Sequence, residues 1–369
     1  MKLLVARADV AIIGAGMAGA SLAAAIGRDA NVLLIEAEAW PGYHSTGRSA
    51  AFWEESYGGP GVQPLTSASY PFLARHSFLK ERGAIHVADE AGLGALDQLV
   101  RDFGEVVRLD PLSRDDVAAA VPGIAPRFVA GLAEPSCRDI DAAGLHAHFL
   151  GEAKRAGVAQ LLDARVQAME YRGGAWHITT RAGEVQASTI VNAAGAWAGE
   201  IAAMAGASPI GVHAFRRTMI QLQVDPPAAA DMPLVMDAMG SFYFKPEPGG
   251  RIWLSPHDET PTPPCDAAPE ELDVAIAIDR FEKAVDWRVL RRERAWAGLR
   301  SFAPDRLPIY GFDRLAAGFF WFAGQGGFGI QTAPAAASLG ASLLLGRSLR
   351  ESLAQVDPER YLPSRFGTT

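Results

Sequence analysis

Apolar runs and glycine-rich turns alternate with alanine-rich stretches at the start of the chain. Residues 8–13 form an apolar run that predicts a buried strand, and the alanine-rich stretch 20–28 predicts a helix. A second apolar run at 31–35 predicts another strand, which ends at Glu36. The glycine-rich turn 14–19 joins the first strand to the helix. This order predicts a strand–turn–helix–strand unit of roughly thirty residues, the local pattern of a nucleotide-binding fold.

A similar pattern returns in the last third of the chain. Residues 318–323 predict a buried strand, and the glycine-rich segment 324–329 follows it. An alanine-rich helix is predicted from residue 330 to 345, with Gly346 as its C-terminal stop. Two hairpin strands and one further apolar strand are predicted upstream, at 166–171, 176–180 and 186–191.

The middle of the chain departs from this pattern. Residues 82–139 and 210–300 mix strand-like runs with prolines and tryptophans, and the proline-rich residues 259–264 predict a loop. The sequence contains no internal repeat. We therefore expect an α/β protein in which a Rossmann-like domain is assembled from separated segments. A second domain, of mixed-sheet α+β character, is inserted into it.

The charge balance and the cysteines exclude several classes of protein. Lys plus Arg number 34 and Asp plus Glu number 42, and the net charge of −8 disfavours nucleic-acid binding. Cys137 and Cys265 lie in no metal-binding spacing, so we predict neither a disulfide framework nor a metal site. Glycines interrupt the apolar stretch 10–27, and the run 319–322 is too short to cross a bilayer. We expect no transmembrane segment and a cytoplasmic protein.

Gly14, Gly16 and Gly19 form a G-x-G-x-x-G turn between the first predicted strand and helix. In such a turn the first glycine permits the sharp bend, the second lets the backbone approach a pyrophosphate, and the third lets helix and strand pack closely. Glu36 lies 22 residues beyond Gly14, where its carboxylate can accept hydrogen bonds from ribose hydroxyls. Its charge would repel a 2′-phosphate. These residues predict a dinucleotide site that disfavours NADP.

Two further segments favour FAD over NAD. Residues 41–51 form a small polar loop whose hydroxyls can donate hydrogen bonds to phosphates, and its Arg48 can neutralise phosphate charge. The segment 326–332 opens the last predicted helix, whose N-terminus would stabilise the negative charge that builds on a flavin during reduction. A simple NAD-binding domain needs neither segment. Three separated segments that converge on one extended cofactor predict FAD.

Four blocks of sequence carry a resemblance to a known family: residues 41–51, 191–197, 296–302 and 325–332. In these blocks, and essentially from end to end, the chain resembles the D-amino acid oxidase-like FAD oxidoreductases. That family includes glycine oxidase, sarcosine oxidase and D-amino acid dehydrogenases, and the chain is most similar to its catabolic D-arginine dehydrogenase type. The resemblance implies a discontinuous FAD-binding domain and an inserted substrate domain. Their expected ranges are 1–82, 140–209 and 301–369 for the former, and 83–139 and 210–300 for the latter.

The resemblance also implies which residues contact FAD. They lie in the glycine turn, at the end of the second strand, in the polar loop, near the hairpin and in the last glycine-rich segment. They are Gly14, Gly16, Gly19, Glu36, Ser45, Thr46, Arg48, Ser49, Ala50, Val166, Ala194, Gly195, Trp197, Gly326, Gly327, Gly329, Ile330, Gln331 and Thr332. Sarcosine oxidases attach FAD through a cysteine near the block that corresponds to residues 298–304. This chain has no cysteine there, so we expect non-covalent FAD.

A substrate site is implied as well. By resemblance, Arg300 clamps the substrate carboxylate and Tyr243 is its hydroxyl partner. Arg217 matches a second arginine of the pocket, Tyr57 matches a mobile tyrosine, and Gln331 matches a residue near the substrate amine and the flavin. A planar guanidinium can hold a carboxylate through two parallel charge-assisted hydrogen bonds, which would fix the substrate over the flavin.

The family implies oxidative deamination of D-amino acids. Hydride passes from Cα to flavin N5, the imine product hydrolyses to a 2-oxo acid and ammonia, and the electrons go on to O2 or a quinone. Where D-arginine dehydrogenase has a glutamate and a histidine, this chain has Ala84 and Phe52. Because a cationic side chain would enter such a pocket unpaired, we expect neutral or apolar substrates. Whether Glu54 or His86 enters the pocket stays open at this point.

Two other functions stay open. One is oxidation of sarcosine, glycine or other N-alkyl amino acids with the same arginine clamp. The other is a flavoprotein without amine chemistry, such as a scaffold or a component of a larger dehydrogenase. Reduction of the yellow protein by D-amino acids, by sarcosine or by neither distinguishes the three.

Overall fold

The computed structural model describes residues 6–367, and its N-terminal unit has the predicted order. Strand β1 (Ala6–Ile13) leads into helix α1 (Met17–Ile26), and strand β2 (Val32–Ile35) follows. The helix begins at Met17 rather than at residue 20, because Gly16 already serves as its N-cap. Residues 10–13 of β1 and all of β2 are buried, as expected for parallel strands covered on both faces.

The first sheet has eight strands and is built around β1. Besides β1 and β2, its strands are β9 (Ala159–Leu161), β10 (Val166–Arg172), β11 (Ala175–Thr180), β12 (Gly183–Asn192), β19 (Ile309–Phe312) and β20 (Phe319–Ala323). β1 pairs in parallel with β2 on one side and with β12 on the other. The carboxyl ends of these three strands therefore meet at one edge, where ligands bind in open α/β sheets.

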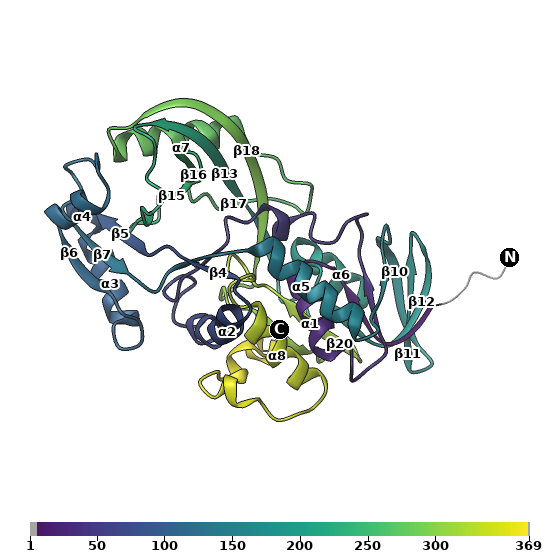
Figure 1. Ribbon diagram of the computed structural model, residues 1–369. Helices are drawn as coiled ribbons and strands as arrows, with labels where there is room; N and C mark the ends of the chain where they lie inside the picture. The colour runs from purple at the N-terminus through teal and green to yellow at the C-terminus, as the bar shows by residue number, and fades with distance from the viewer. Residues whose placement is uncertain (1–5, 368–369) are drawn as a thin grey trace.

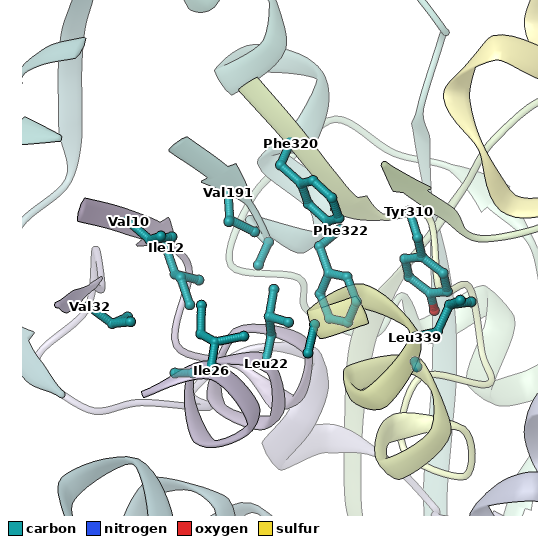
Figure 2. Close-up of a cluster of buried hydrophobic side chains, with 14 of the residues drawn as sticks. Val10, Ile12, Leu22, Ile26, Val32, Val191, Tyr310, Phe320, Phe322 and Leu339 are labelled. Atoms are coloured by element: carbon teal, nitrogen blue, oxygen red, sulfur yellow. The ribbon is translucent and has the colours of Figure 1, made fainter. Parts of the chain in front are cut away.

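Both faces of the sheet are buried at its central strands, and alternate residues of β1 contribute to the two faces. Figure 2 shows one face, on which Ile12 packs with Leu22 of α1 and Phe322 of β20; all three are essentially fully buried. On the other face, Ile13 packs in a cluster that includes Ile201. The helices of this part are α2 (Gln63–Arg75), α5 (Ala142–Arg155), α6 (Ala198–Ala205) and α8 (Ala333–Leu344).

The second sheet has nine strands and is mixed, since β14 and β5 pair in parallel and the other pairs are antiparallel. Its strands are β5 (Ala84–Ala88), β6 (Asp110–Ser113), β7 (Ala130–Glu134), β13 (His213–Asp225), β14 (Leu234–Asp237), β15 (Tyr243–Glu247), β16 (Arg251–Ser255), β17 (Thr260–Pro261) and β18 (Arg288–Phe302). β13 and β18 curve side by side along their whole length (Figure 1). The helices of this part are α3 (Leu93–Phe103), α4 (Arg114–Ala120) and α7 (Glu271–Ala284).

A small third sheet links the two large ones. It consists of β3 (Phe52–Trp53), β4 (Leu79–Glu81) and β8 (Arg138–Ile140). Asp139 of β8 accepts hydrogen bonds from Arg82 (2.7 Å) and from Lys245 of β15 (2.9 Å). The half-buried carboxylate therefore ties this sheet to the second one through charge-assisted hydrogen bonds.

The structure confirms the predicted fold class, a Rossmann-like sheet with an inserted mixed sheet. Two local predictions were wrong. The last helix begins at Ala333 rather than at residue 330, because residues 327–332 form turns. The expected loop 259–264 contains the short strand β17. The exact domain boundaries stay a prediction, and their ends at 1–5 and 368–369 lie outside the described residues. Between residues 6 and 367, no helix is both long and apolar enough to span a membrane.

Candidate active site

A long cleft begins at the carboxyl edge of the first sheet and continues to the second sheet. Its empty space, including the open mouth, is about 1530 Å³. Its lining runs from the glycine turn after β1 to β13, β15 and β18 of the second sheet, so the cleft is long enough to take an extended ligand. The predicted site residues that line it are Gly14, Gly16, Glu36, Ser45, Thr46, Arg48, Ser49, Ala50, Val166, Ala194, Gly195, Trp197, Arg217, Tyr243, Arg300, Gly326, Gly327, Gly329 and Ile330.

Two glycines of the first turn are required by its geometry. Gly14 has φ +103°, and a Cβ there would lie 2.4 Å from the carbonyl oxygen of Ala193. A Cβ on Gly19 would lie 1.8 Å from the carbonyl oxygen of Gly14. Neither position can hold a side chain without moving the backbone. Gly14 thus brings β1 and β12 together at the cleft, and Gly19, which does not line the cleft, seats α1 against the turn.

Glu36 is held at the edge of the cleft by backbone groups. Its Oε2 accepts a hydrogen bond from the Ala15 N–H (2.8 Å), and its Oε1 accepts one from the Glu38 N–H (3.0 Å). Each oxygen keeps a further lone pair, and 9 % of the residue stays exposed where it lines the cleft. The carboxylate is therefore placed to accept hydrogen bonds from a ribose, as the FAD expected from the sequence requires.

The polar loop 41–51 contains a short 3₁₀ helix, η1 (Ser45–Arg48), that lies between the glycine turn and β18. Thr46 Oγ1 accepts a hydrogen bond from the Met17 N–H (2.9 Å), which leaves its hydroxyl proton free to donate. Ser45 Oγ donates to the carbonyl of Leu299 (2.6 Å). Arg48 donates to backbone carbonyls on the β18 side and pairs with Asp266. Its charge therefore fastens the loop to the second sheet as well as lining the cleft.

The far end of the cleft is built around Arg300 of β18. This residue is half-buried, and its Nη1 donates a hydrogen bond to the hydroxyl of Tyr57 (2.6 Å). Gly327 lies directly against the guanidinium. Tyr243 is 1 % exposed and its hydroxyl contacts the sulfur of Met219 (3.1 Å). Among residues 6–367, no carboxylate lies within 4.0 Å of the Arg300 guanidinium, so its charge has no anionic partner from the protein.

A second guanidinium, that of Arg217 on β13, lies in the same end of the cleft. It is 3 % exposed, and its Nε donates to the carbonyl of Asp258 (2.7 Å). Its Nη2 contacts Glu259 (3.2 Å), whereas its buried Nη1 has no hydrogen-bond partner among the described residues. Burial, and next the like charge of Arg300, lower the pKa of Arg217. Two cations thus converge on this end, and one N–H group is left unpaired.

His257 adds no charge to this cluster. Burial first, and then the positive charges of Arg217 and Arg300, lower its pKa to about 3. Its Nδ1 lies 3.0 Å from the carbonyl of Gly240, and its ring meets the edge of Tyr243 at 5.6 Å. The imidazole is therefore neutral across the usual assay range and packs behind the tyrosine.

Gln331 and Thr332 lie beside the cleft rather than in its lining. Gln331 is 2 % exposed, and its Nε2 donates to Thr66 Oγ1 (2.9 Å) and to the carbonyl of Tyr57 (3.1 Å). The same amide exchanges two hydrogen bonds of 3.3 Å with the backbone of Glu54. It thereby fixes the segment 54–57 that carries Tyr57. Thr332 donates to the carbonyl of Phe328.

The question about Glu54 and His86 has a structural answer, because neither residue lines the cleft. Ala84 and Phe52 are buried in an apolar cluster with Tyr243. The two cysteines also lie away from the cleft: Cys137 is buried in that cluster and Cys265 is exposed. This placement agrees with non-covalent FAD, which stays a prediction.

Sequence reasoning missed Met219 and Arg165, which line the cleft. Met219 lies two positions after Arg217 on β13, so it shares a face with that residue. The strand alternation could therefore have identified it. Arg165 lies over the Trp197 ring (5.8 Å), a long-range contact that gives no local sequence signal.

Comparison with known proteins finds similarity to FAD-dependent oxidoreductases. Residues 9–343 match the model of a family described as FAD dependent oxidoreductase. Mitochondrial dimethylglycine dehydrogenase of Rattus norvegicus is 25% identical over 403 residues, which cover 96% of this chain and 45% of that protein. The chain thus spans less than half the length of the curated relative.

Solved structures give the same picture of the fold. Glycine oxidase from Geobacillus kaustophilus matches with a TM-score of 0.81 and 22% identity, covering 95% of this chain and 98% of that one. L-proline dehydrogenase from P. horikoshii matches with a TM-score of 0.82 and 22% identity, covering 97% and 98%. At this identity, the similarity shows a shared fold.

Replacing Glu36→Gln is expected to weaken FAD binding by roughly 10–150-fold. The variant loses the charge-assisted acceptor for the ribose, a contact worth about 1.5–3 kcal/mol. Titration of the apoprotein with FAD, followed by flavin fluorescence, measures the affinity. Glu200→Gln, an exposed carboxylate on α6, is the matched control. Equal affinities in the two variants would show that Glu36 does not contact the cofactor.

Proposed function

Because this chain belongs to the FAD dependent oxidoreductase family, we propose that it oxidises the Cα–H bond of an amino acid, and specifically of D-amino acids with neutral or apolar side chains. The observation that carries the proposal is the pair of guanidiniums at the inner end of the cleft. Arg300 has no carboxylate partner among residues 6–367, and Arg217 keeps an unpaired buried N–H. A substrate carboxylate supplies what both groups lack.

Family membership confirms FAD as the cofactor predicted from the three glycine-rich and polar segments. The glycine turn, Glu36 and the 45–50 loop would hold its nucleotide half, and the segment 326–330 would lie at the flavin. When bound, FAD supplies an acceptor for the hydride that leaves Cα. The finer resemblance to D-arginine dehydrogenases stays a prediction.

Arg300 would bind and orient the substrate. Its planar guanidinium can donate two parallel hydrogen bonds to a carboxylate, while Nη1 keeps its contact with Tyr57. Tyr243, on β15 of the same sheet, also lines the cleft, and its hydroxyl can turn from the Met219 sulfur to the same carboxylate. Fixing the substrate in this way supplies several kcal/mol of barrier lowering through orientation alone.

The same cations favour a reactive protonation state of the substrate. A substrate ammonium would lie near two guanidiniums, and like charges disfavour the charged form of an amine. The neutral amine, whose lone pair assists departure of hydride from Cα, is therefore favoured in the cleft. No carboxylate of the cleft is needed to remove a proton during hydride transfer. The imine product then hydrolyses in water to a 2-oxo acid and ammonia.

The surroundings of Tyr243 support a neutral side chain. Ala50 and Met219 line the cleft beside Tyr243, and the three belong to one apolar cluster that Phe52 and Ala84 extend behind the lining. The nearby carboxylates Glu54 and Glu134 are fully buried and lie outside the cleft lining. A cationic side chain would find no partner here and would lose its hydration.

A second candidate function is oxidation of an N-alkyl amino acid such as sarcosine, or of glycine. Dimethylglycine dehydrogenase among the relatives and glycine oxidase among the structural matches favour it. The arginine clamp would serve both substrates, since each bears a carboxylate next to the reacting carbon. The electron acceptor, O2 or a quinone, is a separate question that a dye assay run with and without O2 resolves.

Arg300→Met should lower kcat/KM by about two to four orders of magnitude, with FAD content nearly unchanged. The reason is that truncating one partner of a hydrogen-bonded charge pair in a desolvated site costs roughly 2–5 kcal/mol or more. Steady-state kinetics with a dye acceptor measure the loss. Arg288→Met, at an exposed position of the same strand, controls for removal of an arginine from β18. Near-wild-type kinetics in Arg300→Met would rule out the clamp.

Anaerobic reduction of the bound flavin should rank the substrates. We expect D-leucine, D-methionine and D-phenylalanine to bleach the protein with a higher second-order rate constant than D-arginine. The expected margin is roughly 10–150-fold, the value of one charge-assisted hydrogen bond. Sarcosine ranking first would select the second candidate function. D-arginine ranking first by tenfold would contradict the apolar pocket, and reduction by no amino acid would contradict both functions.

A further inference from the structure

A cluster of three ionisable side chains lies outside the cleft and takes no part in the proposed chemistry. Glu54 comes directly after β3, His86 lies on β5, and Glu134 ends β7. Both carboxylates are 0 % exposed and His86 is 8 % exposed. One ligand atom from each side chain lies within 4.8 Å of the other two. Three distant parts of the sequence thus bring a nitrogen and two carboxylate oxygens to one buried point.

Glu54 has no adequate partner in this cluster. Its Oε1 lies 3.1 Å from Nε2 of His86, and this contact is an ion pair only while the imidazole is protonated. Neither of its carboxylate oxygens accepts a hydrogen bond from any described residue. Leaving a buried carboxylate unsatisfied costs several kcal/mol, so such groups are normally paired, protonated or bound to a metal.

Hydrogen bonds orient the Glu134 carboxylate, but no lysine or arginine in the described part of the chain neutralises its charge. Its Oε2 accepts a hydrogen bond from Ser56 Oγ (2.6 Å), and its Oε1 accepts one from the Glu55 N–H (2.8 Å). The Ser136 hydroxyl also donates to Oε1 (3.3 Å), so Oε2 is the oxygen that keeps a lone pair for another partner. Among residues 6–367, no Lys or Arg nitrogen lies within 4.0 Å of either carboxylate. With a neutral imidazole, the cluster therefore carries two buried negative charges that no neighbouring cation offsets.

We propose that Glu54, His86 and Glu134 bind one divalent first-row transition metal ion, such as Zn²⁺. Such an ion binds imidazole nitrogen and carboxylate oxygen at about 2.0–2.2 Å, which places ligand atoms roughly 3–4 Å apart. The separations in the cluster need only small side-chain shifts to meet that geometry. The ion matches the two negative charges, and the donor set of one imidazole and two carboxylates suits zinc.

The hydrogen bonds around Glu134 act as the outer shell of this site. Ser56 and the Glu55 N–H fix its carboxylate, in the way that outer partners orient metal ligands. The ion would join the segment 54–57 to β5 and β7 of the second sheet. Since Tyr57 ends that segment and contacts Arg300, the site would hold the substrate end of the cleft in place. This role is structural and does not depend on the amino acid that is oxidised.

The charges of the cluster also shift the pKa values of Glu134 and His86. Burial, and next the charge of Glu54, raise the pKa of Glu134 to about 7. Burial acts to lower the pKa of His86, but Glu54 and then Glu134 outweigh it and raise that pKa. Both shifts express a negative potential that a proton or a metal ion would relieve. A proton shared by the two carboxylates is the competing explanation.

The test is metal binding by the untagged, FAD-loaded protein. After removal of metals with a chelator, equilibrium dialysis against Zn²⁺ is expected to give one tightly bound ion per chain. Glu54→Gln and His86→Gln should each weaken this binding at least about 100-fold, since loss of outer partners alone costs about 10–100-fold. His213→Gln, at an exposed position on β13, should bind like the wild type.

A second readout separates binding from misfolding. Zn²⁺ should raise the Tm of the wild type and of His213→Gln, because a ligand of the folded state stabilises it by mass action. It should leave the Tm of His86→Gln unchanged, while the FAD content of that variant stays at the wild-type value. Substoichiometric zinc in the wild type, or the same affinity in His86→Gln, would overturn the proposal and leave the cluster as a proton-sharing pair.

Discussion

The guanidinium of Arg300 is the charge around which the inner end of the cleft is organised. It lies near the end of β18, and the long pairing of β18 with β13 also brings Arg217 to the same place. Two like charges in a confined site are unfavourable unless an anion joins them. Glu259 contacts Arg217, but Tyr57, Tyr243 and Gly327 surround Arg300 without supplying an anion to it. This unpaired charge supports the proposal that the site binds a carboxylate.

The fold places Arg300 at a fixed position relative to the glycine turn. The C-terminal end of β18 contacts the 45–48 segment, which itself caps the glycine turn through Thr46. The end of the second sheet is thus fastened to the nucleotide-binding edge of the first. A cofactor that starts at Glu36 and extends past Ser45 would end beside Arg300. Side-chain hydrogen bonds from Thr46, Ser45 and Arg48 to backbone groups thus fix the spacing between the two ends of the cleft.

The sequence predicted the parts of this arrangement that are local. Gly14, Gly19 and Glu36 follow from one strand–turn–helix–strand unit, whose spacing is fixed by backbone geometry. The resemblance placed Arg300 and Tyr243, and the structure brings both to the cleft. The structure also shows that Gln331 fixes the segment of Tyr57 through long-range hydrogen bonds. These contacts, like the buried cluster of Glu54, His86 and Glu134, join residues that are far apart in the sequence. Hydrophobic periodicity does not predict such contacts.

The central claim is that the cleft binds a carboxylate through Arg300. It is tested most directly by a ligand that cannot be oxidised. Leucine without its amino group, 4-methylpentanoate, should perturb the visible spectrum of the bound flavin in a saturable way, and its primary amide should not. In Arg300→Met, the response to the acid should be lost. Equal binding of acid and amide, or an unchanged response in the variant, would contradict the account.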